Sequence, residues 1–173
     1  IAPHTAKAMV ETPWGTALIT RSQAGLTGLW FDGQKDHPGV LEHVATMPHD
    51  PLLRTCAEQL CAYGQGLLTE FDLPLDLHGT DFQRDVWRAL LKIPDGRLTT
   101  YGALARQLDR PDASRAIGAA VGMNPVAVIV PCHRVVGRNG ALTGYSGGLQ
   151  RKIELLRHEG ATISDGKAYM KPK

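Results

Sequence analysis

The pattern of apolar residues changes near residue 78, and this change limits the possible folds more than any other feature of the chain. Three short segments before it have the composition of strands and are separated by Gly and Pro: residues 7–11, 16–20 and 26–31. After residue 79, apolar side chains recur at helical spacing. We therefore predict a small α/β domain over residues 1–78, containing an antiparallel meander, and a mostly helical domain over residues 79–173.

The rest of the first domain contains one clear helical pattern. Residues 50–65 carry apolar side chains at the spacing of one helix face. Residues 32–51 are rich in Gly, Pro, His and Asp, which predicts a loop with a short helix near Leu41. Residues 71–77 alternate apolar and acidic side chains, but Pro74 allows only an edge strand or an extended linker.

The second domain begins with three predicted helices that have recognisable starts. Thr80 and Gln83 fit a capping box, Thr100 is placed to cap a helix over residues 101–108, and Asp112 to cap one over residues 113–123. Two short helices joined by a tight turn are typical of a helix-turn-helix. A last helix is expected near residues 149–157, followed by a frayed tail over residues 161–173.

The helix over residues 113–123 consists almost entirely of small side chains, with a single charged one, Arg115. Small residues allow close packing against another helix, or close approach to a nucleic-acid backbone. An arginine among small residues fits a protein core poorly, which favours the second interpretation.

The charge distribution points in the same direction. Net charge is only +2, but residues 1–78 carry four Lys or Arg against nine Asp or Glu, whereas residues 79–173 carry fifteen against eight. A basic half suggests a polyanionic partner. Charge alone is equally compatible with a simple role in solubility. No apolar run approaches the roughly 20 residues that span a bilayer, so no membrane partner is expected.

The cysteines indicate a reducing compartment. There are three, Cys56, Cys61 and Cys132, and no export signal is recognisable at the start of the sequence, so we expect a cytoplasmic protein without disulfides. Cys56 and Cys61 lie five residues apart in a helical pattern and lack further Cys or His at ligand spacing. We therefore expect no metal site there.

Cys132 is the best candidate nucleophile. It follows an apolar run over residues 126–130, predicted to be a buried strand or extended segment that Pro131 ends. His133 is the adjacent candidate base. Because consecutive side chains of an extended chain point to opposite faces, the two could cooperate only across a turn or through a bridging water. Glu159 is the best candidate to orient the histidine.

Several motifs around Cys132 together resemble the O6-alkylguanine-DNA alkyltransferases. They cover the chain from about residue 79 to 160, and the first domain is similar only through residues 12–15 and its strands. The motifs are residues 131–136 (PCHRVV), 124–125 (NP), 144–148 (GYSGG), 156–160 (LRHEG), 82–83 with Trp87, and 101–105 (YGALA).

The resemblance implies a ribonuclease-H-like α/β domain followed by a winged helix-turn-helix domain. It implies double-stranded DNA containing O6-alkylguanine as the partner, bound in the minor groove by the small-residue helix. Arg115 would enter the base stack and Tyr101 would help to extrude the target base. The DNA contacts expected on or near this helix are Arg110, Ser114, Arg115, Ala116 and Gly118.

For the chemistry, the resemblance implies that Cys132 accepts the alkyl group, His133 deprotonates it through water, and Glu159 orients His133. Asn124 would bond this network. The expected groups near the target base are Tyr101, Ser146 and Val135, with Lys152 close to the site. We expect a single-turnover reaction on O6-alkylguanine and O4-alkylthymine, no cofactor or metal, and a monomer that can bind DNA cooperatively.

Two other classes compete with repair. A DNA-binding regulator or lesion sensor could use the same winged helix, and a chain that starts at Ile1 without a methionine would suit a piece of such a protein. A cysteine hydrolase is disfavoured because no oxyanion-hole motif is recognisable and the helix around Arg115 would have no purpose.

Overall fold

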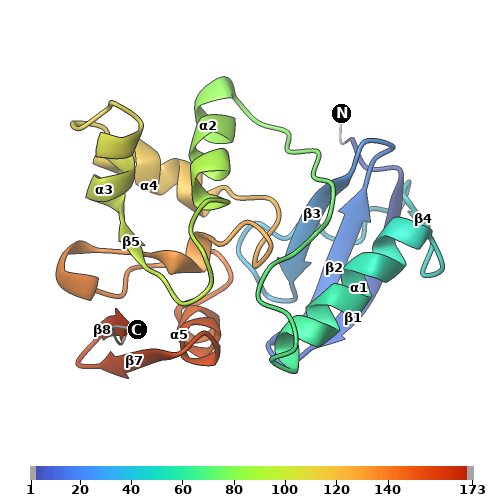
Figure 1. Ribbon diagram of the computed structural model, residues 1–173. Coiled ribbons are helices and arrows are strands. Elements are labelled where there is room, and N and C mark those ends of the chain that lie inside the picture. The colour runs from blue at the N-terminus through green and yellow to red at the C-terminus, as the bar shows by residue number, and fades with distance from the viewer. Residues whose placement is uncertain (1–2, 171–173) are drawn as a thin grey trace. The chain divides into compact units, whose positions relative to one another are not determined.

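The computed structural model describes residues 3–170, which form two compact units (Figure 1). The first unit runs to His78 and also includes Pro125–Ala127. The second comprises Gly79–Asn124 and the chain from Val128 onward.

The first unit is built on a four-stranded sheet of order β3-β2-β1-β4. Its strands are β1 (Ala6–Thr12), β2 (Gly15–Arg21), β3 (Leu26–Phe31) and β4 (Ala45–Thr46). β1 to β3 form the predicted antiparallel meander, and the short β4 pairs in parallel with β1. All six residues of β3 are buried, which makes this strand part of the core of the unit.

Helix α1 (Pro51–Gly64) packs on β1 and β2, as Figure 1 shows. Asp50 caps it, since its carboxylate accepts a hydrogen bond from the Leu53 amide at 3.0 Å. The helix buries one face, consisting of Leu53, Cys56, Leu60 and Tyr63. The predicted helix over residues 50–65 is thereby confirmed.

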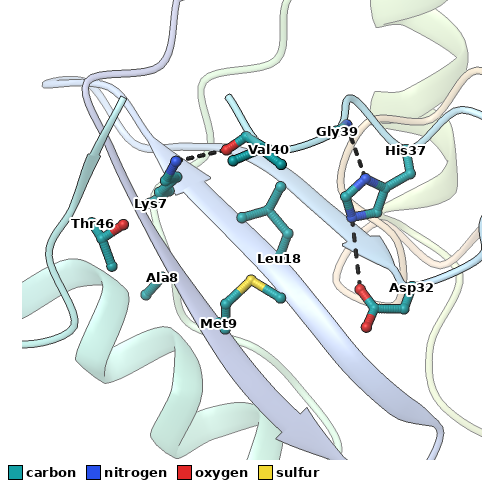
Figure 2. Close-up of a pocket in the computed structure, with 9 residues that line it drawn as sticks. All are labelled: Lys7, Ala8, Met9, Leu18, Asp32, His37, Gly39, Val40 and Thr46. Carbon is teal, nitrogen blue, oxygen red and sulfur yellow. Dashed lines mark hydrogen bonds and ion pairs between the residues drawn. The ribbon is translucent and has the colours of Figure 1, made fainter. Parts of the chain in front are cut away.

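The short helix predicted near Leu41 is wrong. Leu41 has φ +54°, a left-handed conformation that interrupts a right-handed helix, and the segment leads into β4 instead. The Lys7 ammonium donates to the Val40 and Leu41 carbonyls at 2.6 and 2.8 Å, which fixes the loop beside β1. A pocket of about 450 Å³ lies between this loop and strands β1 and β2 (Figure 2).

Residues 71–77 form an extended edge segment with only one β-bridge, between Leu75 and Leu26. The Leu26 amide donates to the Pro74 carbonyl, and the Asp76 amide donates to the Leu26 carbonyl. Gly25 is required at this point, because a Cβ there would come within 2.7 Å of the Pro74 backbone. The sequence prediction of an edge segment is confirmed.

The second unit contains four helices in its described part (Figure 1). These are α2 (Asp81–Leu90), α3 (Tyr101–Gln107), α4 (Ser114–Gly122) and α5 (Leu149–His158). The predicted capping box of Thr80 and Gln83 is present at α2, and Thr100 caps α3. Helices α2 and α3 both pack against α4, and the Trp87 indole donates to the Ala120 carbonyl at 2.8 Å.

The predicted cap of α4 is wrong. The helix begins at Ser114, so its N-cap is Ala113, and no side chain makes a capping hydrogen bond there. Asp112 lies one residue too early, because only the residue directly before the first helical one can act as N-cap.

Two other predictions for this half of the chain are also wrong. Residues 126–130 are buried as expected, but they form turns, with one bridge at Val126 and φ +70° at Val128. No strand in the described residues pairs with them further. The expected frayed tail is a hairpin of β7 (Ala161–Ser164) and β8 (Lys167–Met170), whose Ala161 and Ala168 pack against Val136 and Leu156. The last three residues of that tail prediction lie outside the described part.

The short elements that remain connect the helices of the second unit. β5 (Thr99–Thr100) pairs in parallel with β6 (Val135–Val136), and two 3₁₀ turns occur, η1 (Cys132–Arg134) and η2 (Arg138–Gly140). Over residues 3–170, no helix combines the length and the apolar character that crossing a membrane requires.

Candidate active site

Cys132 lies at the start of η1, and only 3 % of the residue is exposed. The Asn124 side-chain amide donates to the Cys132 Sγ at 3.1 Å and to the Val130 carbonyl at 2.8 Å. Because Asn124 follows directly after the C-cap of α4, this amide fastens the thiol loop to that helix.

The groups around the Cys132 thiol shift its pKa in opposite directions. Burial raises its pKa, because a thiolate loses hydration in the interior. The Asn124 amide, the Lys152 ammonium and the Tyr145 side chain all lower the pKa of the same thiol. Each of the three stabilises the charged form, but burial is the larger effect, so the pKa of Cys132 stays above its ordinary value and the thiol needs a base to lose its proton.

His133 is fully buried and meets Glu159 on one side of its ring. Its Nε2 lies 2.9 Å from the Glu159 Oε2. Burial lowers the pKa of His133, while the neighbouring carboxylate raises it. An ionised carboxylate can only accept, so Nε2 carries the proton and Nδ1 keeps its lone pair. The Nδ1 atom is buried and has no hydrogen-bond partner within residues 3–170, so it is available as a base.

Glu159 is the C-cap of α5, and it is held in the ionised form by Arg134 as well as by His133. The Arg134 Nε and Nη2 donate to its two oxygens at 2.8 Å each, and Nη1 donates to the Ile93 carbonyl at 2.6 Å. Burial raises the pKa of Glu159, but His133 and Arg134 outweigh this effect and hold the pKa far below its ordinary range.

Lys152 points its ammonium group into the same interior region. The Lys152 residue on α5 is 1 % exposed, and its Nζ donates to the Val135 carbonyl at 2.6 Å. Burial lowers the pKa of Lys152 to about 8, while interaction with Cys132 raises it. A buried amine of this kind provides positive potential close to the thiol.

Of the residues predicted for the site, the structure places Cys132 in hydrogen-bond contact with Asn124, and His133, the next residue in the chain, in contact with Glu159. Tyr101, Ser146 and Val135 take up other positions. The Tyr101 hydroxyl bonds the Thr143 hydroxyl at 2.9 Å, and Ser146 is half-buried in the glycine-rich loop. Val135 contributes its backbone carbonyl to Lys152.

Sequence reasoning missed the contributions of Arg134 and Tyr145, although both lie in the quoted motifs. Nothing in the sequence shows that the Arg134 side chain reaches Glu159, 25 residues away. One signal in the sequence could have indicated the role of Arg134. It is a charged residue that directly follows the candidate pair Cys132 and His133 in an otherwise apolar stretch.

Helix α4 presents its predicted DNA-facing residues to solvent. Ser114, Arg115 and Ala116 are exposed and Gly118 is half-buried. Its opposite face is core, formed by Ile117, Ala120 and Val121. Packing within the unit does not require a glycine at position 118, because a Cβ there would lie 3.8 Å from the Tyr101 ring, in ordinary contact. Arg110 is exposed and stacks on the Phe82 ring at 5.3 Å from its centroid.

Metal ligation finds no support in the arrangement of side chains. Within the described residues, no three His, Cys, Asp or Glu side chains are grouped so that they could hold an ion. Cys56 is buried among apolar side chains of α1, and burial raises the pKa of its thiol to about 12, whereas Cys61 is exposed. The absence of a metal in the functional protein stays a prediction.

Comparison with known proteins finds a match to one family for both halves of the chain. The sequence model described as the 6-O-methylguanine DNA methyltransferase ribonuclease-like domain matches residues 6–77, and that of the DNA-binding domain of the same family matches residues 81–161. The chain belongs to the 6-O-methylguanine DNA methyltransferase family. The predicted fold class, a ribonuclease-like α/β domain followed by a helical DNA-binding domain, is confirmed for this family member.

Individual family members are similar over most of their length. The methylated-DNA–protein-cysteine methyltransferase of Mycolicibacterium paratuberculosis is 56 % identical over 159 residues, covering 90 % of this chain and 94 % of that protein. The protein of the same name from Mycobacterium bovis is 59 % identical over 150 residues, covering 87 % and 89 %. The crystal structure of Mycobacterium tuberculosis OGT in complex with DNA has a TM-score of 0.83 and 44 % identity, covering 90 % and 92 %.

Proposed function

We propose that this family member is a DNA repair protein that transfers an alkyl group from O6-alkylguanine in duplex DNA to its own Cys132. The observation that carries the proposal is the buried Cys132 thiol, contacted by Asn124 and followed in the chain by a histidine that is paired with a carboxylate. The relatives named as methylated-DNA–protein-cysteine methyltransferases support this reaction.

The proposed reaction is a displacement at carbon. His133 Nδ1 takes the thiol proton through a water, and the Cys132 sulfur attacks the alkyl carbon. As the S–C bond forms, the C–O6 bond breaks and its electron pair goes to the guanine. The guanine takes up one proton, which the His133 imidazolium returns through water, and it stays in the DNA strand as restored guanine. The Lys152 ammonium and the Asn124 amide stabilise the thiolate as His133 removes the proton, which offsets part of the effect of burial on the pKa of the thiol.

The role of Glu159 in this proposal is to orient His133 and stabilise the imidazolium. It is supported by the Nε2–Oε2 distance of 2.9 Å and by a side chain that is fully buried. Because the carboxylate stays ionised, the imidazole is fixed in the tautomer that leaves Nδ1 free.

We propose that the reaction occurs once for each molecule. The product is a thioether on Cys132, which has no good leaving group, and the contacts around the sulfur offer nothing that would remove an alkyl group. The charges needed for the displacement come from the chain's own side chains, so the proposal includes no cofactor. We extend it to O4-alkylthymine, which presents the same alkyl–oxygen bond.

DNA engagement is proposed to occur through α4 in the minor groove, with the target base extruded from the stack. Arg115 is exposed on this helix among Ser114 and Ala116, and Arg110 is exposed just before it, so positive charge and small side chains occur together. Tyr101, Ser146 and the Val135 carbonyl are proposed to contact the extruded base. We propose that the protein acts as a monomer in the cytoplasm and can bind DNA cooperatively.

The decisive experiment is incubation with duplex DNA containing one O6-methylguanine, followed by mass spectrometry of the cysteine peptides. We expect one methyl group for each protein molecule on the Cys132 peptide and none in Cys132→Ala. Cys61→Ala is the matched control, since Cys61 is an exposed thiol, and it should react like the wild type. Tight DNA binding without transfer would overturn repair in favour of a lesion sensor.

A second experiment tests the DNA-inserting role of Arg115. Arg115→Ala should lower the rate on duplex DNA by about 100-fold, because base extrusion costs a few kcal/mol. The rate with free O6-methylguanine should be unchanged. Arg54→Ala, which removes an exposed arginine from α1, is the control and should alter neither rate. Equal losses of Arg115→Ala on both substrates would contradict the role.

A further inference from the structure

The Arg134 guanidinium lies between two carboxylates, and only one of them belongs to the proposed catalytic network. It holds Glu159 through two hydrogen bonds, and its Nη2 also lies 3.9 Å from the Asp95 Oδ2. Asp95 belongs to the turn after α2, and the Arg134 bond to the Ile93 carbonyl fixes this turn beside the guanidinium. Asp95 is mostly buried, with 21 % of its side chain exposed.

We propose that Asp95 is a positioning residue that, through Arg134, increases the tendency of His133 to take up the proton of Cys132. The inference deepens the proposed function and rests on it. Asp95 touches neither the substrate nor the reacting sulfur in this proposal. It changes the net charge around the Arg134–Glu159 pair, which holds His133 in place.

The charge count supports this role. Arg134 and Glu159 carry opposite charges, so this pair has no net charge. With a neutral His133 beside the pair, the three side chains together have no excess charge that a proton on His133 would neutralise. A second carboxylate on Arg134 leaves the group with one excess negative charge, which proton uptake by His133 removes. Water is largely excluded from the His133, Glu159 and Arg134 side chains, and the Asp95 side chain is 21 % exposed, so solvent screens this charge less than it would screen one on the open surface.

The groups that face Asp95 are four, and they act in both directions. Burial and Glu159 raise the pKa of Asp95, whereas Arg134, His158 and His133 lower it. The contacts that connect Asp95 to His133 run through the Arg134 guanidinium and the Glu159 carboxylate. The groups that lower the pKa of the Cys132 thiol are different ones, namely Asn124, Lys152 and Tyr145. Because the contacts of Asp95 lead through Arg134 and Glu159 to His133, whereas Asn124 contacts the Cys132 sulfur, Asp95 acts more on the charge of His133 than on that of Cys132.

The test is Asp95→Asn, which keeps the shape of the side chain and removes its charge. We expect the rate of methyl transfer from free O6-methylguanine at pH 8 to fall about threefold, because the base is weaker. We also expect the acidic limb of the pH–rate profile to move to lower pH, because His133 loses its proton more readily. Asp95→Glu retains the charge and should restore the wild-type profile. Asp165→Asn, an exposed carboxylate in the β7–β8 turn, is the matched control.

A second measurement separates this inference from the function on which it rests. The titration of the His133 ring, followed by NMR in the unreacted protein, should move to lower pH in Asp95→Asn. If wild-type protein transfers no methyl group but this shift is seen, the proposed function fails and the effect of Asp95 stands. Unchanged NMR titration and pH–rate profiles in Asp95→Asn would overturn the inference, and Asp95→Ser serves as the neutral variant if the asparagine variant does not fold.

Discussion

Each unit contains a buried cysteine, and the two thiols differ in what surrounds them. Burial alone acts on Cys56 in the first unit and raises its pKa to about 12. Burial also raises the pKa of Cys132 in the second unit, but an amide, an ammonium and a tyrosine lower it. The same residue type is therefore an inert part of the core in α1 and a candidate nucleophile in η1.

The buried polar side chains of the two units differ in the same way as the surroundings of the two thiols. The buried polar side chains of the first unit are neutral: Thr20, Ser22, Thr27 and Gln34. Those of the second unit include four that can carry charge: His133, Arg134, Lys152 and Glu159. Burying charge costs free energy unless each ion is paired and hydrogen-bonded. We infer that the second unit carries this cost because the proposed chemistry needs it, whereas the first unit has no such need.

The largest expected effect is that of Glu159→Gln. This change removes the negative charge with which the buried Arg134 is paired, so we expect a loss of about 3–5 kcal/mol in unfolding free energy. We also expect the rate of methyl transfer to fall by roughly 100-fold or more. Urea denaturation and single-turnover kinetics measure the two. Because the folded-state pKa of Glu159 lies below its ordinary value of 4.5, its contribution is complete above that pH and is lost as the pH falls.

The matched control is the arginine–carboxylate pair of the first unit. Arg21 Nη1 lies 2.8 Å from the Asp50 Oδ2, but the two side chains are 21 % and 13 % exposed. We expect Asp50→Asn to cost only about 1 kcal/mol, since partly solvated pairs contribute little and asparagine still caps α1. Equal losses of unfolding free energy in Glu159→Gln and Asp50→Asn would show that the two units do not differ in their dependence on buried charge.

The next effect concerns the pH dependence that Lys152 gives to stability. Its folded-state pKa of about 8 lies below the ordinary 10.5, so in that window the unfolded chain binds more protons and stability rises with pH. Relative to Lys152→Met, the wild type should gain up to about 3 kcal/mol between pH 8 and 10.5. Denaturation at both pH values measures this gain, and a constant difference between the two proteins would contradict the burial of a charged amine.

The smallest effect is expected in the first unit, from Thr20→Val. Thr20 and Thr27 share a hydroxyl–hydroxyl hydrogen bond of 2.8 Å in the core, and valine has nearly the same shape. We expect a loss of about 1 kcal/mol that does not vary between pH 7 and 9, because the titratable ring bonded to Thr27, that of His4, has a pKa below its ordinary 6.5 and is neutral in this range. A strong pH dependence of this loss would show that the first unit also relies on buried charge.

Much of this protein is determined locally by its sequence. The meander, the capping box of α2 and the Thr100 cap of α3 follow from interactions between residues a few positions apart, so their patterns could be interpreted correctly. Where the outcome depended on distant partners, interpretation failed. Residues 126–130 have the composition of a strand but find no strand to pair with over their length, and residues 161–170 have a weak pattern but acquire a hairpin by packing on Val136 and Leu156.

The candidate site divides in the same way. The sequence by itself predicted which residues would carry the proposed chemistry, because Cys132, His133 and Glu159 lie in motifs that resemble those of the family. Only the tertiary structure decided how they are arranged: that Arg134 clamps Glu159, that Lys152 is buried toward the Val135 carbonyl, and that Asp95 reaches Arg134. The reason is physical, since the strength of a charge depends on burial and on partners that folding brings from other parts of the chain.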